Sequence, residues 1–476
     1  MEYEAVIGLE VHAELSTQTK IYCNCKNSFG LEVNSQVCPI CMGMPGTLPK
    51  LNENVVNYAI KMGQALHCNI NNVCRMDRKN YFYPDLPKAY QISQSDVPLC
   101  ENGYLDVLVD DKVKRIGVTR IHIEEDAGKL LHNEAFAGSL VDLNRCGVPL
   151  IEIVSEPDMR SSAEAKAYLE TIKLTLMYLG ISDCKMQEGS IRCDVNVSVR
   201  EKGSDKFGTR TEMKNVNSFS AAQRGIDYEI ERQIKVLESG GTINQETRRW
   251  DDVNGENKPL RSKEDAHDYR YFPEPDMLTI VVPEEKVQDI KNSLPKLPSD
   301  KLIHYVSDLG LNTAEAFLMA ENEDKAKMLD ECVAIGKCSS RSIFNWITGD
   351  ISRYMNETGK SIFDTKLTPE KLCELIAVIE SGMISNNSGK IVFEELLESD
   401  NDIRTIIEQK GLSQISDKTA LYDIANQVIN DNQKSVDDYK GGKTNALGFL
   451  VGQCMKASKG KANPGLMKEI ILELIG

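Results

Sequence analysis

The stretch Gly189-Ser-Ile-Arg-Cys-Asp-Val-Asn-Val-Ser-Val-Arg200 decides the fold class of this chain. Apolar residues from Ile191 to Val199 alternate with polar residues from Arg192 onward. A period of two residues predicts a β-strand with one buried and one polar face. On this strand alone, a solvated surface and a face that carries functional residues are equally good interpretations of the polar side.

Two further segments favour a working face. Residues 5–15 alternate in the same way and place Glu10 and His12 on one side of a strand. Residues 118–126 end in the run His122-Ile-Glu-Glu-Asp126. Carboxylates repel one another, so they gather on one face mainly where a cation lies between them. These strands therefore indicate a sheet that serves as a platform for chemistry.

The bulk composition excludes several classes of protein. With 476 residues the chain is too long for a single core, so we expect two or three domains. Its formal net charge of −16 argues against broad, non-specific nucleic-acid binding. The sequence shows no signal-peptide pattern and no apolar run of about 18 residues, so we expect a cytoplasmic protein that does not span a membrane. Its 14 cysteines are then expected as core thiols or metal ligands rather than disulfides.

Four of the cysteines form two close pairs, Cys23-Asn-Cys25 and Cys38-Pro-Ile-Cys41. Two pairs separated by a short loop suit tetrahedral thiolate ligation of zinc. The alternative is four unrelated buried thiols, since the other cysteines are scattered singly. The paired spacing favours zinc, and four thiolates leave no open position, so the site is predicted to be structural.

One carboxylate lies inside an otherwise apolar run, Leu150-Ile-Glu-Ile-Val154. Burying Glu152 without a partner would be costly. The position therefore predicts a neighbouring positive charge or a metal ion.

Residues 75–87 combine cations, aromatic rings and prolines. Such a segment can hold phosphate through Arg78 and Lys79 and stack a nucleic-acid base on Tyr81 or Tyr83. A surface loop with ordinary aromatic packing is the alternative, and without other evidence it is the better interpretation.

The pattern changes along the chain. Residues 1–292 are predicted to form one β-rich domain with a few helices, among them a helix capped by Ser161 and ending near Leu179. Beyond a proline-marked linker, helical periodicity takes over, with Thr368 as an N-cap. We expect a helical domain over 293–404 and a smaller helical tail domain over 405–476.

The tail has a local excess of positive charge. No acidic residue occurs between positions 439 and 462, whereas that stretch contains five lysines, Lys440, Lys443, Lys456, Lys459 and Lys461. A phosphate-contacting patch and a solvated helix surface are equally good interpretations. The chain has no G-x-G motif and no P-loop, so any nucleotide would have to bind elsewhere, with Mg²⁺ on the acidic sheet.

Several long motifs resemble those of one family, the B subunit of the aspartyl/glutamyl-tRNA amidotransferase (GatB family). They extend from the first strand to the tail and comprise Ile7–His12, Asp77–Pro84, His122–Lys129, Pro149–Asp158, Tyr269–Asp276, Gly448–Gln453 and Lys459–Pro464. The resemblance implies an α+β fold. Its catalytic domain would be a cradle of antiparallel strands related to glutamine synthetase, followed by a helical domain and a tail domain that binds tRNA.

The resemblance also implies a reaction. Members of this family are ATP-dependent carbon–nitrogen ligases that phosphorylate the side-chain carboxylate of Glu-tRNA(Gln) or Asp-tRNA(Asn). Ammonia from glutamine, released in a separate amidase subunit, then forms Gln-tRNA(Gln) or Asn-tRNA(Asn). The expected assembly is a heterotrimer with that amidase subunit (A) and a small C subunit. ATP, Mg²⁺ and a structural Zn²⁺ are the expected cofactors.

Carried onto this sequence, the resemblance assigns site residues. The Mg²⁺ ligands are expected to be His12, Glu125 and Glu152, with Glu10, Glu124 and Asp194 close by as further catalytic residues. Lys79, Arg192 and Asn196 are the expected ATP contacts. Because Glu124 and Glu125 are neighbours on a strand, they point to opposite faces, and the sequence leaves open which one binds the metal.

Two other functions remain as alternatives at this level. One is a stand-alone amide ligase acting on a small amino acid, which would leave the basic tail without a role. The other is a non-catalytic tRNA-docking scaffold, for which the acidic residues of the sheet would be dispensable.

Overall fold

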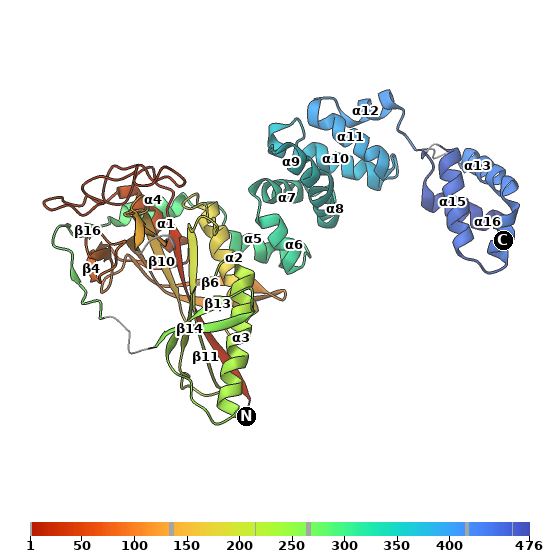
Figure 1. The fold of residues 1–476 in the computed structure, drawn as a ribbon. Helices are drawn as coiled ribbons and strands as arrows, with labels where there is room; N and C mark the ends of the chain where they lie inside the picture. Colours follow the sequence, from red (N-terminus) through yellow and green to blue (C-terminus); the bar gives the residue numbers. More distant parts are fainter. Residues whose placement is uncertain (1, 133–137, 215, 263–267, 415–417, 459) are drawn as a thin grey trace. The chain divides into compact units, whose positions relative to one another are not determined.

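The computed structural model describes residues 2–132, 138–214, 216–262, 268–414, 418–458 and 460–476. The chain divides into two compact units (Figure 1). The first comprises residues 1–306 with 312–316, and the second comprises residues 307–311 with 317–476. The first unit therefore continues beyond residue 292, where the sequence predicted its end.

The first unit is built on a sheet of nine strands in the order β14-β13-β12-β11-β1-β10-β7-β6-β2. All neighbouring strands are antiparallel except β12 and β13. The strands are β1 Tyr3–Glu14, β2 Asn69–Ile70, β6 Cys100–Val109, β7 Lys112–Glu125, β10 Pro149–Ser155, β11 Ile191–Glu201, β12 Thr211–Lys214, β13 Glu246–Asp251 and β14 Glu256–Ser262. The predicted antiparallel sheet and α+β class are confirmed.

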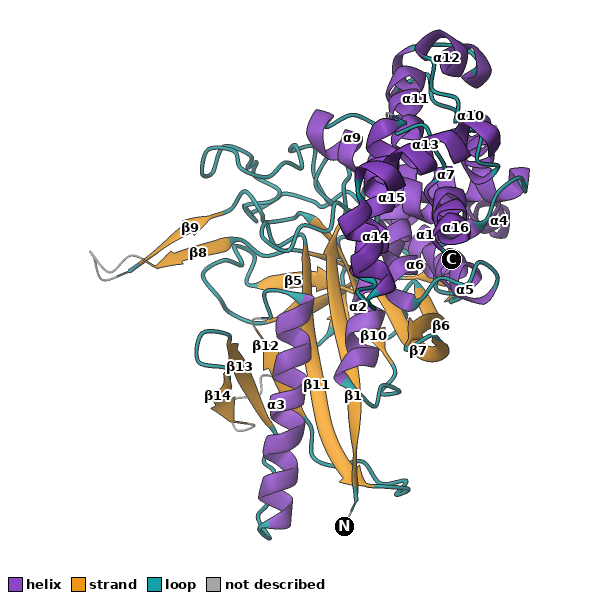
Figure 2. Ribbon diagram, turned by 90° about the vertical axis from the view of Figure 1, so that its right-hand side faces the viewer, coloured by secondary structure: helices purple, strands orange, loops and turns teal. Residues whose placement is uncertain are grey.

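Smaller ladders surround this sheet. They consist of β15 Phe272–Pro273, β4 Asp77–Asn80 and β5 Tyr90–Ser93, of β16 Ile280–Val281 with β3 Val73–Cys74, and of β8 Lys129–His132 with β9 Ser139–Asp142. The β8–β9 hairpin projects from the unit in Figure 2. The β15–β4–β5 ladder carries Lys79 and joins segments about 190 positions apart in sequence.

The alternation of β11 is confirmed by its burial. Ile191, Cys193, Val195 and Val197 are at most 4% exposed and belong to the core. The apolar faces of the central strands are covered by α1 Glu53–Ala65, α2 Ser162–Tyr178 and α3 Phe219–Glu238. Figure 2 shows α2 and α3 against the strands. The opposite, polar faces of β1, β7, β10 and β11 are therefore available for chemistry.

The helix predicted after Ser161 is confirmed as α2. The Ser161 side chain accepts a hydrogen bond from the backbone N–H of Glu164, and the Glu164 carboxylate accepts one from the N–H of Arg160. Gly180 follows the helix with φ +64°, a conformation that glycine adopts without strain. Side chains thus satisfy backbone groups at the N-terminus of this helix, and a glycine ends it.

The remaining helices continue to the C-terminus of the chain. Those with bounds in the described residues are α4 Glu284–Asn292, α5 Pro298–Ser307, α6 Thr313–Ala320, α7 Glu323–Ile335, α8 Ser340–Trp346, η2 Ile347–Ile351, α9 Ser352–Thr358, η3 Ile362–Asp364, α10 Pro369–Glu380, α11 Asn386–Glu398, α12 Ile403–Lys410, α13 Lys418–Asp431, α14 Gln433–Lys440, α15 Asn445–Ala457 and α16 Pro464–Ile475. Thr368 caps α10 as predicted. In the second unit, helices α13 to α16 enclose a hydrophobic cluster of their own. None of the helices in the described part of the chain combines the length and apolar character needed to cross a membrane.

Candidate active site on the polar face of the sheet

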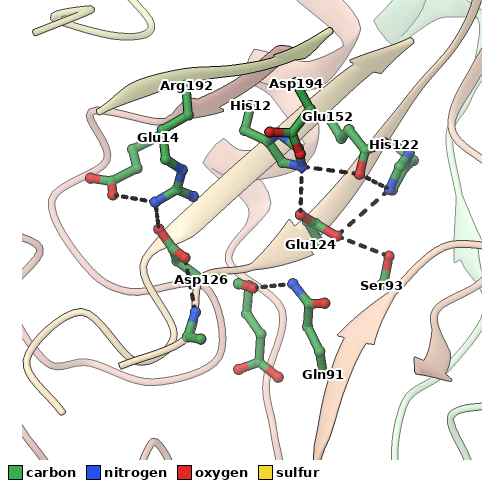
Figure 3. A network of polar contacts seen from close by, with 12 residues as sticks. His12, Glu14, Gln91, Ser93, His122, Glu124, Asp126, Glu152, Arg192 and Asp194 are labelled. Carbon is green, nitrogen blue, oxygen red and sulfur yellow. Dashed lines mark hydrogen bonds and ion pairs between the residues drawn. The ribbon is translucent and has the colours of Figure 1, made fainter. Parts of the chain in front are cut away.

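Strand register brings the central group of the site together. His12 of β1 lies opposite Glu152 of β10, and Glu152 lies opposite His122 of β7. The Glu152 Oε2 atom is 3.3 Å from His12 Nε2 and 3.4 Å from His122 Nε2 (Figure 3). The lone carboxylate of the apolar run is thus placed between two imidazoles, which offset the cost of burying it.

Glu124 completes this group. Its carboxylate is 3.8 Å from His12 Nε2 and 3.7 Å from His122 Nε2, and it accepts a hydrogen bond from Ser93 (Figure 3). Glu124 is two residues from His122 on β7, so both side chains point to the same face.

Glu125, the other glutamate considered as a metal ligand, does not join this group in the structure. Its carboxylate pairs with Lys88 and accepts a hydrogen bond from the backbone N–H of Ile92. Successive residues of a strand face opposite sides, so only one of the two glutamates can reach His12. The structure brings together His12, Glu124 and Glu152.

The electrostatics of this group are those of a site that attracts positive charge. Burial by itself would lower the pKa of His12, but a hydrogen bond to Glu152 and the charges of Glu152 and Glu124 outweigh it and raise that pKa to about 9. Burial opposes ionisation of Glu152 and Glu124 as well, yet the nearby histidines hold the pKa of both carboxyls below its usual range. The carboxylates therefore remain charged, and they draw a proton onto His12.

These residues fit a divalent cation. The ligand atoms of His12, Glu124 and Glu152 all lie within 4.8 Å of one another. A cation about 2.1 Å from each ligand requires separations of about 3–4 Å, and His12 Nε2 lies 3.3 Å and 3.8 Å from the two carboxylates. The Nδ1 atom of His122 is buried without a hydrogen-bond partner in the structure.

A second acidic group lies next to the first. Glu10, Asp194 and Glu212 also present oxygens within 4.8 Å of one another. Burial and the charge of Glu152 raise the pKa of Glu10. Asn196 donates a hydrogen bond of 2.9 Å to Glu10 Oε1, and Lys214 of β12 pairs with both Asp194 and Glu212. The predicted residues Glu10, Asp194 and Asn196 are thus in mutual proximity, and a lysine neutralises part of their charge.

Arg192, expected as an ATP contact, is held by carboxylates of this chain. It lies opposite His12 on β11, and its guanidinium is 2.9 Å from Asp126 and 3.9 Å from Glu14 (Figure 3). Burial would lower its pKa, but the charge and hydrogen bond of Asp126 raise it. The side chain is 34% exposed. Any phosphate contact of Arg192 would therefore be shared with Asp126.

Lys79 is a cation held by aromatic rings. Its ammonium lies 4.9 Å from the centre of the Tyr269 ring and 6.0 Å from that of Tyr81. Burial would lower the pKa of Lys79, but the charges of Glu124, Tyr271 and Glu152, among others, raise it. Among the described residues no carboxylate is close enough to form an ion pair with it. Lys79 is therefore available to an anionic ligand beside the His12 group.

The four paired cysteines converge as predicted. Cys23, Cys25, Cys38 and Cys41 present sulfur atoms within 4.8 Å of one another. A hydrogen bond from Cys23, the backbone N–H of Cys38 and the ammonium of the fully buried Lys20 lower the pKa of Cys41 to about 4. Zinc binds thiolates, and the surroundings of Cys41 favour its thiolate form. Together with the convergence of all four sulfur atoms, this fits a structural zinc ion.

The tail lysines lie on a different unit. Lys440, Lys443, Lys456 and Lys461 are exposed, and Lys443 pairs with Asp438 at 2.8 Å. Lys459 lies outside the described residues.

The sequence patterns did not predict three lysines that lie at these sites, Lys20, Lys88 and Lys214. Only the short alternation Thr211-Glu-Met-Lys214 carries a signal for one of them, because it places Glu212 and Lys214 on one strand face.

Fold and site together define a protein whose candidate divalent-cation centre lies on the polar face of a largely antiparallel sheet. It also has a four-thiol cluster and a helical C-terminal unit. The family model for the GatB/GatE catalytic domain matches residues 5–288, and that for the GatB domain matches residues 327–475. The chain belongs to this family.

Curated relatives match the sequence of this chain over nearly its whole length. Relatives named as the B subunit of aspartyl/glutamyl-tRNA(Asn/Gln) amidotransferase are 56% identical in Thermoanaerobacter pseudethanolicus, 54% in Caldicellulosiruptor saccharolyticus and 50% in Clostridium botulinum. Each match covers 99% of this chain and 99% of the relative. The resemblance found in the sequence motifs is confirmed.

Proposed function

We propose that this chain is the B subunit of a tRNA-dependent amidotransferase and that its sheet carries the ATP-dependent step. It would phosphorylate the side-chain carboxylate of Glu-tRNA(Gln), Asp-tRNA(Asn) or both, and then convert it to the amide. The observation that carries this proposal is the group of His12, Glu124 and Glu152 with Lys79 beside it.

The reaction explains why such a group is needed. A carboxylate is a poor electrophile, and phosphorylation gives it a leaving group. Transfer of a phosphoryl group to an anion needs positive charge between the reacting groups. Mg²⁺ bound at His12, Glu124 and Glu152 would supply that charge and orient the ATP phosphates.

The chain's own residues would do the rest. Lys79 has no carboxylate partner among the described residues, so its ammonium is free to contact a phosphoryl oxygen and stabilise the developing charge. Arg192, shared with Asp126, would hold a phosphate from the β11 side. Glu10 and Asp194 lie on the same face and would bind a second cation after Lys214 moves from Asp194. The side-chain amide of Asn196, beside Glu10, would contact a phosphate oxygen.

Ammonia would come from partners. The relatives are named as one subunit of an amidotransferase, and the proposed assembly is a heterotrimer with an amidase subunit and a small C subunit. The exposed lysines of the tail would contact tRNA phosphates.

Zinc at the four cysteines would fix the loop that packs against the sheet near Glu125. Charged tRNA is made in the cytoplasm, which is therefore the proposed location.

The test uses the assembled complex with glutamyl-tRNA(Gln), γ-labelled ATP and either glutamine or ammonium. Phosphate release and Gln-tRNA formation are followed together. His12→Ala is expected to abolish both while glutamine hydrolysis in the partner persists. His67→Ala, a histidine stacked on Tyr104 outside the site, serves as the matched control. Formation of Gln-tRNA by the His12 variant would place the chemistry in another subunit.

A further inference from the structure

Lys20 is a buried cation that the acidic site does not use. Its side chain is fully buried, and among the described residues no carboxylate lies within ion-pairing distance of its ammonium. Lysine is almost never fully buried without a partner for its charge. The ammonium donates to the backbone carbonyls of Gln36 at 2.8 Å and Leu143 at 3.4 Å, and to Cys41 Sγ at 3.7 Å. Its three N–H groups therefore all have acceptors, and of these the Cys41 sulfur is the one that can carry a negative charge.

The charge of the four-thiol cluster explains this placement. Four thiolates carry more negative charge than one Zn²⁺ neutralises, and Cys23 and Cys41 are buried, so the excess charge is costly. Lys20 brings a positive charge against one of the four sulfur atoms. The backbone N–H of Cys38 donates to the same sulfur at 3.1 Å. A neutral side chain could fill the space of Lys20, but it would leave the excess charge of the zinc–thiolate group unbalanced.

Lys20 also joins two segments of the chain. Its backbone N–H donates to the carbonyl of Cys25 at 2.9 Å, within the first cysteine pair. The next residue, Ile21, donates to the carbonyl of Gly147 at 2.9 Å, and the Lys20 ammonium contacts the carbonyl of Leu143. Residues 20 and 21 therefore hold segment 143–147 at both of its ends.

Segment 143–147 in turn supports Asp126. The Gly147 N–H donates to the backbone carbonyl of Asp126 at 3.0 Å, and the Asp126 N–H donates to the carbonyl of Val148 at 2.9 Å. The guanidinium of Arg145 lies 3.7 Å from the Asp126 carboxylate. The position of Asp126 thus depends on backbone and side-chain contacts with this segment.

A continuous path of contacts reaches the acidic site. At the zinc end, a Cβ built on Gly147 would lie 3.7 Å from Cys41 Cβ, which is ordinary van der Waals contact. At the other end, the Asp126 carboxylate holds the guanidinium of Arg192 at 2.9 Å on the polar face of the sheet (Figure 3). The path leads from the cysteine ligand through Lys20 to a cation proposed to contact phosphate.

We propose that Lys20 is a positioning residue that couples the zinc centre to the ATP-dependent site. Its ammonium offsets the charge of the zinc thiolates and at the same time holds segment 143–147, on which the placement of Asp126 and Arg192 depends. The inference rests on the proposed function, which supplies the zinc ion and the phosphate contact, and adds the connection between them. Loss of zinc and a neutral residue at position 20 then have the same effect at Arg192, although neither change touches that side chain.

The first test is spectroscopic and uses the full chain with Co²⁺ in place of zinc. Lys20→Met removes the charge and keeps an unbranched side chain. The thiolate-to-cobalt absorption band is expected to move to longer wavelength, because a sulfur without a positive charge beside it donates electrons more readily. Zinc affinity, measured by competition with a chelator, is expected to fall about 10- to 100-fold. Lys50→Met, at an exposed lysine whose backbone N–H donates to Tyr22, is the matched control. If either the band or the affinity of the Lys20 variant keeps its parental value, the proposal is overturned.

The second test measures the connection. Hydrogen exchange is expected to become faster in segment 143–148, both in Lys20→Met and in the parental chain after zinc removal. Exchange in helix α2 is expected to stay unchanged, which shows that the chain remains folded. In the assembled complex the KM for ATP is expected to rise about tenfold, as for one weakened charge-assisted hydrogen bond, with the KM for charged tRNA unchanged. Returning zinc to the parental chain is expected to reverse both changes, and this arm does not depend on the folding of a variant.

The outcomes separate this inference from the proposed function. Unchanged hydrogen exchange in segment 143–148 and an unchanged KM for ATP would overturn the coupling and leave the proposed function standing. A parental chain that does not bind zinc, in a complex that still releases phosphate from ATP, would do the same. Absence of ATP-dependent phosphate release from the parental complex would overturn the proposed function and, with it, the role of Lys20 in that step.

Discussion

The adjacent residues Glu124 and Glu125 provide a sharp test of the site, because the same substitution is expected to reduce the reaction rate at one position and stability at the other. Glu124 faces His12 and Glu152, whereas Glu125 pairs with Lys88 away from them. Glu124→Gln is expected to remove a cation ligand, and Glu125→Gln is expected to break a buried ion pair.

The magnitudes follow from the geometry. Glu124 Oε1 is 3.8 Å from His12 Nε2, so a cation on His12 would be within about 4 Å of this carboxylate. At an effective dielectric constant of about 20, one charge and a divalent cation at that distance attract by about 8 kcal/mol before desolvation is subtracted. Loss of one preorganised charge of this kind costs about 10²–10³-fold in rate.

At Glu125 the effect is on stability. The side chains of Lys88 and Glu125 are only 14% and 6% exposed. Removing one partner of a buried ion pair costs about 3–5 kcal/mol, because the other charge remains buried and unpaired. With a chelator present, Glu124→Gln is expected to lower the free energy of unfolding less than Glu125→Gln does. Its amide can still accept from Ser93, and the repulsion from Glu152 disappears.

The assay combines two measurements on the assembled complex and the isolated chain. Cation-dependent phosphate release from ATP with charged tRNA is expected to fall about 10²–10³-fold for Glu124→Gln and to persist in Glu125→Gln. Chemical denaturation with chelator is expected to show the larger loss of unfolding free energy for Glu125→Gln. If Glu125→Gln loses cation-dependent ATP consumption and Glu124→Gln keeps it, the assignment of strand faces is wrong.

Three further predictions concern the other sites. Cys38→Ser is expected to release zinc and lower thermal stability, whereas Cys184→Ser, at an isolated buried thiol, keeps the metal; a parent protein without zinc in elemental analysis would end this prediction. In the metal-free protein the pKa of His12 is raised to about 9, so cation binding must displace a proton below that pH; Mn²⁺ affinity is expected to rise about tenfold per pH unit between pH 7 and 9, and calorimetry in buffers of different ionisation enthalpy would detect the released proton. A flat affinity over that range would contradict this reasoning. Replacing Lys440 and Lys456 by Gln is expected to raise the KM for tRNA and reduce the salt dependence of binding by about two charges, with the KM for ATP unchanged; an unaffected tRNA KM would remove these lysines from the interface.

The sequence by itself determined much of the architecture. Strict alternation in β11 and β1 predicted strands with one polar face, because a strand presents successive side chains to opposite sides regardless of its partners. Ser161 and Thr368 marked helix starts, since capping depends only on neighbouring residues. The spacing of Cys23, Cys25, Cys38 and Cys41 likewise predicted a cluster that the structure brings together.

Tertiary structure decided which residues share the site. Alternation placed Glu124 and Glu125 on opposite faces, but it could not say which face meets His12. That depends on the register between β7, β10 and β1, which is set by packing of the whole sheet. Lys214 reaches Asp194, and Lys88 reaches Glu125, from segments distant in sequence. Local alternation links Lys214 only with Glu212 on its own strand and carries no information about contacts to other segments. The local sequence therefore predicts the strands and helices and which side chains share a face. Which of these side chains meet in one site is decided only when strands distant in sequence pair in a particular register.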